Sequence, residues 1–82
     1  MSALAPTVLI RAARGSDGPA LRRLAALDSA DVPRGAVLVA ESDDEVVAAV
    51  SVDTGERIAD PFRPTADVVD LLEFRARRLR SS

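Results

Sequence analysis

The sequence contains no cysteine, histidine, lysine, tyrosine or tryptophan among its 82 residues. Their absence excludes a disulfide framework, a thiolate nucleophile, an imidazole or lysine base, a phenol acid and the commonest metal ligands. We therefore expect no metal site and no catalytic residue of these types, which weighs against an enzyme.

Aromatic residues are scarce as well, since Phe62 and Phe74 are the only two. The core must therefore consist of valine, leucine, isoleucine and alanine. We expect Phe62 to pack against this core. Phe74 lies off the main apolar stripe of its helix, so it indicates a second buried surface such as a subunit interface.

Long apolar runs are also absent. Even the longest, such as residues 46–50, are far shorter than a membrane span. Residues 1–6 are too short and uncharged for a signal peptide. The formal net charge of −2 argues against a dedicated nucleic-acid binder. We expect a cytoplasmic protein with no membrane partner.

The length of the chain predicts one domain. We expect an arm over residues 1–6, one small α/β domain over residues 7–80 and a tail over residues 81–82. Runs of β-branched and apolar residues predict strands at residues 7–11, 36–41, 45–52 and 57–60. Apolar periodicity predicts helices at residues 19–30 and 66–80, the first of them capped by Ser16 or Asp17. The second helix is expected to bury one apolar face, made of Val68, Leu71, Leu72, Ala76 and Leu79.

This order predicts an α/β (α+β) fold, with two helices and a four-stranded sheet that is mixed or mostly antiparallel. The strands at residues 36–41 and 45–52 are apolar at consecutive positions, which is typical of strands covered on both faces. Either the helices lie on opposite faces or a second copy covers one face. The hairpin turn at Asp43 and Asp44 lacks the glycine that such turns prefer, so its type stays open.

Three charged groups are candidate binding sites, each with a plainer alternative. Arg63 could bind an anion at the N-terminus of the last helix, or it could pair with Asp60 or Asp67. The acidic residues 43–45 could hold a cation, but they lack the spacing of a calcium loop and are typical of a soluble turn. Arginines near the end of the last helix could contact RNA or an acidic membrane surface, or could simply complement the helix dipole. They are Arg75, Arg77, Arg78 and Arg80.

Three stretches resemble the GNAT superfamily of N-acetyltransferases, and together they cover most of the chain. Residues 9–13 (Leu-Ile-Arg-Ala-Ala), with the helix that follows, are similar to the family's opening strand and first helix. Residues 37–41 and 46–52 are similar to its second and third strands. Residues 60–63 (Asp-Pro-Phe-Arg) are similar to the Pro-x-x-Arg lead-in to its acetyl-CoA loop.

The sequence departs from the family directly after this lead-in. In the family, small residues such as Gly-x-Gly follow the arginine and let backbone amides approach the diphosphate of the cofactor. Here Pro64 removes an amide donor and Asp67 adds a carboxylate. The family's fifth strand and later elements have no counterpart in the sequence. The resemblance therefore implies a truncated, inactive relative.

Two functions are compatible with this resemblance. The first is a non-catalytic interaction or structural module, a homodimer or the partner of another protein, that acts through a sheet edge and the face around Phe62 and Phe74. The alternative is an acyl-CoA-binding N-acetyltransferase completed by dimerisation. In that case Arg63 and the amides of Thr65 and Ala66 would hold the phosphates of acetyl-CoA.

Overall fold

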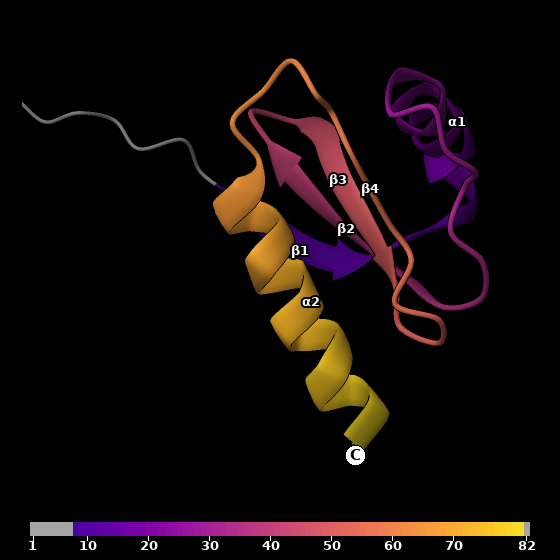
Figure 1. Cartoon of the computed structure of the whole chain (residues 1–82). Coiled ribbons are helices and arrows are strands. Elements are labelled where there is room, and N and C mark those ends of the chain that lie inside the picture. Colours follow the sequence, from indigo (N-terminus) through magenta and orange to yellow (C-terminus); the bar gives the residue numbers. More distant parts are fainter. Residues whose placement is uncertain (1–7, 82) are drawn as a thin grey trace, which may run out of the picture.

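The computed structural model describes residues 8–81, which form four strands and two α-helices (Figure 1). The strands are β1 (Val8–Ala12), β2 (Val37–Ser42), β3 (Glu45–Ser51) and β4 (Arg57–Ala59). The helices are α1 (Gly18–Leu27), which follows a 3₁₀ turn (Gly15–Asp17), and α2 (Ala66–Ser81). The predicted order of strands and helices is confirmed. The arm predicted for residues 1–6, and the residues Thr7 and Ser82, lie outside the described residues.

The four strands form one sheet in the order β1-β2-β3-β4, and each neighbouring pair is antiparallel. The expectation of a mostly antiparallel sheet is confirmed, and the sheet contains no parallel pair. The turn between β2 and β3 places both Asp43 and Asp44 at positive φ, 53° and 67°. Positive φ at both central residues is what a type I′ hairpin turn requires, and aspartate tolerates it better than most residues.

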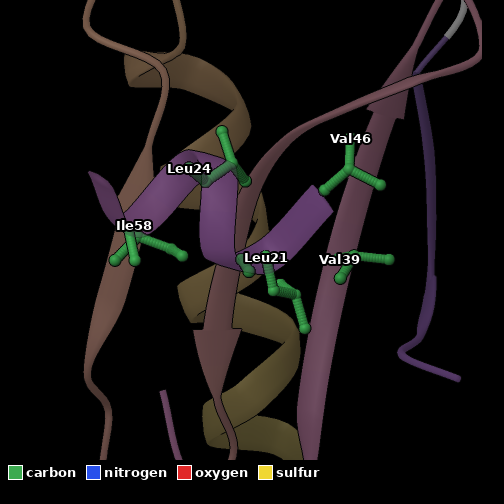
Figure 2. Close-up of a cluster of buried hydrophobic side chains, with 7 residues drawn as sticks. Leu21, Leu24, Val39, Val46 and Ile58 are labelled. Atoms are coloured by element: carbon green, nitrogen blue, oxygen red, sulfur yellow. The ribbon is translucent and has the colours of Figure 1, made fainter. Parts of the chain in front are cut away.

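The two helices cover opposite faces of the sheet (Figure 1). Because side chains alternate along a strand, neighbouring apolar residues point to different helices. Val39 and Ala49 pack with α1, whereas Leu38 and Ala48 pack with α2. Figure 2 shows Leu21 and Leu24 of α1 in the first of these clusters, with labelled side chains from β2, β3 and β4. Consecutive apolar residues in the central strands therefore reflect two cores, and no second copy is needed to cover a face.

A bulge in β3 adjusts which side chains reach each core. Ala40 pairs with Ala48, but the next residue of β2, Glu41, pairs with Val46, so Val47 is an extra residue in β3. An extra residue reverses the alternation beyond it. Val46 consequently joins the α1 cluster although Ala48, two positions later, belongs to the α2 cluster.

The first helix is shorter than predicted, because α1 ends at Leu27 and not at residue 30. Ser29 adopts a φ of 52°, a left-handed conformation that cannot continue a right-handed helix. The backbone then leaves the helix through a turn in which the amide of Ala30 donates to the carbonyl of Ala25.

The buried face of α2 is narrower than predicted. Leu72 and Ala76 are buried, but Leu71 and Leu79 are 51% and 52% exposed. Leu71 lies about 100° around the helix from Leu72 and faces away from the sheet. Leu79 shares the side of Leu72 and Ala76, but the C-terminal part of α2 extends beyond the strands (Figure 1). The prediction is therefore wrong for Leu71, which lies off the core face, whereas Leu79 lies on that face as predicted but is not buried.

Phe62 does not pack into the core, contrary to the prediction, because it is 81% exposed. It lies in the loop between β4 and α2, where its backbone amide donates to Asp60 Oδ1 at 2.8 Å. This short turn fixes the backbone at the surface, so the side chain projects outward. Both cores are instead filled by the aliphatic side chains of the strands and helices.

Candidate functional site

Arg63 lies in the loop between β4 and α2 and is held by two carboxylates. Its guanidinium pairs with Glu45, the first residue of β3, and its Nε lies 3.9 Å from Asp60 Oδ2. Of the two partners expected from the sequence, Asp60 is found and Asp67 is not in an ion pair with Arg63 in the described residues. Glu45 was not anticipated, because its approach depends on the position of the β2–β3 hairpin tip.

Asp60 organises this loop from a buried position, with 7% of the residue exposed. Besides the amide of Phe62, its carboxylate faces Arg23 of α1, whose Nη1 lies 4.0 Å from Asp60 Oδ2. Arg23 also donates to the carbonyl of Val46 at 3.2 Å. The loop, α1 and β3 are thus joined by one polar cluster. The Asp60 carboxylate at its centre contacts the Phe62 amide, Arg23 and Arg63 of the same chain.

The three residues proposed to hold acetyl-CoA phosphates lie together at the start of α2. The carbonyl of Thr65 accepts the amide of Val69 at 2.8 Å, which begins the helix, and Ala66 is exposed in its first turn. Two features oppose a diphosphate there. Pro64 offers no amide, and Arg63 is paired with Glu45 and Asp60, so an incoming phosphate would meet their negative charges. The residues present do not fit this group.

A second charged cluster, which the sequence analysis missed, joins β1 to β2 and to the 3₁₀ turn. Arg11 donates through Nε to Glu41 Oε2 at 2.7 Å. Its Nη1 and Nη2 donate to the two carboxylate oxygens of Asp17 at 2.8 and 2.9 Å. Asp17 also accepts the amide of Arg14 at 2.7 Å, and it makes no side-chain capping bond to α1. Its position at the N-cap was anticipated, but its partner was not.

The hydrogen bonds of this cluster shift the protonation equilibria of both partners. The guanidinium of Arg11, with the amide of Arg14, lowers the pKa of Asp17 well below its usual range. The carboxylates of Asp17 and then Glu41 raise the pKa of Arg11. These hydrogen bonds join β1, β2 and the 3₁₀ turn, so the cluster stabilises the tertiary structure. Glu41 of β2 pairs with Leu9 of β1, so Arg11, two residues after Leu9, lies on the same face of the sheet as Glu41. The sequence alone does not reveal this proximity, because it depends on how the two strands pair.

The arginines near the end of α2 lie at the surface. Phe74, Leu79 and several of these arginines line a shallow, open hollow on the helix. The guanidinium of Arg78 lies 5.7 Å from the centroid of the Phe74 ring, within range of a cation–π contact. Arg75, Arg77 and Arg80 take part in no ion pair with residues 8–81. This part of the surface combines positive charge with exposed apolar groups.

The acidic hairpin tip lies at the opposite end of the sheet from the C-terminus of α2 (Figure 1). Asp43 and Asp44 are exposed and border a second open hollow with Leu9 and Glu41, whereas Glu45 is engaged by Arg63. Within residues 8–81, no group of three or more acidic side chains is arranged to hold a metal ion. Neither helix of the described chain has the length and apolar character needed to cross a membrane.

Comparison with known proteins adds no further assignment. No family model, no curated protein and no solved structure matches this chain.

Proposed function

We propose that this chain is a non-catalytic interaction or structural module of the cytoplasm, with a GNAT-like arrangement of elements, whose partner is a protein and in the first instance a second copy. One observation carries the proposal: the two aromatic residues of the chain, Phe62 and Phe74, are 81% and 50% exposed. Aromatic side chains contribute large apolar areas to cores and interfaces. A domain that builds both cores from aliphatic residues and leaves both phenylalanines outside is suited to contact another protein.

The charges around Phe62 support a binding role over a catalytic one. The charges of Arg63 and Asp60 could in principle polarise a substrate. Each is instead engaged by a partner within the chain: Arg63 by Glu45 and Asp60, and Asp60 also by the amide of Phe62. The chain has no cysteine, histidine or lysine, so no thiolate, imidazole or amine can act beside them as nucleophile or base. The resemblance to the GNAT fold is supported by the element order and remains a proposal about ancestry.

Two measurements on the purified chain test the proposal. Molar mass is measured by sedimentation over a range of protein concentrations, and thermal unfolding is measured with and without acetyl-CoA. We expect mass and melting temperature to rise with protein concentration and acetyl-CoA to leave the melting temperature unchanged. A ligand at a hundred times its dissociation constant would add about 2.7 kcal/mol of stability, which such a melt detects easily.

The opposite result would support the acyl-CoA alternative. Stabilisation by acetyl-CoA that disappears in Arg63→Ala but persists in Arg22→Ala would place the cofactor at Arg63, Thr65 and Ala66 and overturn the proposal. Arg22 is a suitable control because it is exposed on α1, outside this loop. Binding to a polyanion such as heparin, weakening steeply with salt, would instead indicate a role for the terminal arginines in nucleic-acid contact.

A further inference from the structure

The outward side of α2 carries six exposed residues that form one continuous stripe, called here the outward stripe. Its members are Asp67, Asp70, Leu71, Phe74, Arg77 and Arg78. Their spacing of three and four residues places them on one half of the helix. The opposite half, with Leu72 and Ala76, packs against the sheet. In Figure 1 none of the other helices and strands of residues 8–81 covers the side of α2 that faces away from the sheet.

The outward stripe changes character along the helix. It begins with the carboxylates of Asp67 and Asp70, continues with the apolar side chains of Leu71 and Phe74, and ends with two arginines. Asp67, Asp70 and Arg77 are in no ion pair with any residue from 8 to 81. A new partner for these three would therefore break no ion pair within the chain.

This order complements itself when a second helix runs antiparallel to the first. A two-fold axis that passes near residue 73 brings Asp67 opposite Arg78 of the second copy. The same axis brings Asp70 opposite the second copy's Arg77. Each pair matches to within one residue, or about 1.5 Å along the helix. A two-fold axis repeats each pair, so four ion pairs would flank the centre.

The apolar part of the stripe falls at the middle of this arrangement. Leu71 of one copy lies beside Phe74 of the other, and both side chains are half-exposed in the single chain. Apolar groups at the centre and charges toward the ends match the usual anatomy of a protein interface. Antiparallel helices also align their dipoles favourably, because opposite partial charges then lie side by side.

We infer that two copies of this chain associate through antiparallel packing of their α2 helices along the outward stripe. The inference rests on the proposed interaction function and specifies its partner and surface. A uniformly anionic partner, such as a lipid surface or RNA, fits less well, because Asp67 and Asp70 would face its phosphates. A single pair of helices buries less than a standard interface of about 1,600 Å², so the dimer is of the weak, concentration-dependent class.

Reversing the charges at either end of the stripe tests the inference. The variant Asp67→Arg/Asp70→Arg has a stripe with only positive charges, and Arg77→Glu/Arg78→Glu has one with only negative charges. Each variant alone should dimerise at least about tenfold more weakly than the native chain, because like charges would meet across the axis. An equimolar mixture of the two should recover association, because every pair then again joins opposite charges. Sedimentation velocity measures both results.

A matched control separates this effect from a general change in charge. Arg75→Glu/Arg80→Glu makes the same change in net charge as Arg77→Glu/Arg78→Glu, on the same helix but outside the stripe. It should keep most of the native association. Circular dichroism of each variant at low concentration establishes that α2 still forms. Recovery in the mixture is itself evidence of folding, since unfolded chains would not pair specifically.

Three results would overturn the inference. One is a native chain that stays monomeric up to about 1 mM, so that any dissociation constant lies above the millimolar range. The second is a dimer that neither charge reversal weakens, which would leave the interaction module standing with a different surface. The third is a pair of weakened variants whose mixture recovers no association. Stabilisation by acetyl-CoA, by contrast, would overturn the proposed function itself, so the two failures are distinguishable.

Discussion

The cluster around Arg11 and the outward stripe of α2 both contain aspartates and arginines, but they differ in where the partners lie. Arg11, Asp17 and Glu41 satisfy one another at distances of 2.7 to 2.9 Å between strands and a turn. The stripe holds Asp67, Asp70 and Arg77 outside any ion pair with the described residues. Charges of the first kind stabilise the fold, whereas charges of the second kind are available for recognition.

Burial makes the same distinction. The side chains of Arg11 and Asp17 are 17% and 9% exposed, so their ion pair is partly withdrawn from water and weakly screened. The charges on α2 are exposed, and ion pairs within one such helix typically contribute less than 1 kcal/mol. We therefore expect substitutions in the first region to change the free energy of unfolding. Substitutions in the stripe should change association and leave the single chain almost unaffected.

The largest effect is expected from two adjacent leucines of α2 that face opposite ways. Leu72 is fully buried against the sheet, so Leu72→Ala should cost about 3 kcal/mol of unfolding free energy. Leu71 is half-exposed, and Leu71→Ala should change that free energy by less than about 0.5 kcal/mol. Urea unfolding at low protein concentration measures both. Equal losses in the two variants would mean that the orientation of α2 differs from the one described.

The next largest effect is expected at Asp17. Asp17→Ala removes the carboxylate that accepts two bonds from Arg11 and one from Arg14, and we expect a loss of about 2 kcal/mol. Asp67→Ala provides the control, because it removes a carboxylate that lies in no ion pair with the described residues and should cost less than about 1 kcal/mol. If both variants lost the same stability, the contrast between the two regions would be wrong.

The sequence predicted features set by neighbouring residues better than contacts between distant ones. Strand and helix order followed from local pattern, and Asp60, three residues before Arg63, was anticipated as its partner. Glu45, 18 residues from Arg63, was not, because it reaches the loop only through the β2–β3 hairpin. The pairing of Arg11 with Asp17 was missed for a related reason: a cap and an ion pair compete for the same carboxylate, and spacing alone does not decide between them.

Phe62 and Leu71 illustrate a second limit. Apolar character predicted burial for both, but the area available on the sheet was filled by Leu72, Ala76 and the strand residues. Which apolar residues remain outside depends on how many the two cores can accept, and a local pattern does not contain that number. Phe74, identified as lying off the main stripe, was predicted better because helical periodicity alone sets its direction.

A smaller effect is expected from pH, and its direction follows from the lowered pKa of Asp17. Because the folded-state pKa lies below the unfolded value of about 3.9, the contribution of Asp17 is complete above that value. It is lost as the pH falls toward the folded-state pKa. The difference in unfolding free energy between the native chain and Asp17→Asn should be constant above about pH 5 and should shrink below about pH 4. Urea unfolding across this range measures it, and a difference that grew toward acid would contradict the assigned ion pair.

The smallest effect on the fold is expected from Phe74, where the two regions are most sharply separated. Phe74→Ala removes a half-exposed ring and its contact with the guanidinium of Arg78, which at an exposed site contributes about 0.5 kcal/mol. At low concentration the melting temperature should therefore hardly change. At high concentration the same variant should associate more weakly than the native chain, because the ring lies at the centre of the antiparallel pair. Phe62→Ala, which removes an exposed ring outside α2, should weaken this association less than Phe74→Ala does. A reversed ranking of the two phenylalanines would move the contact surface from α2 to the loop that precedes it.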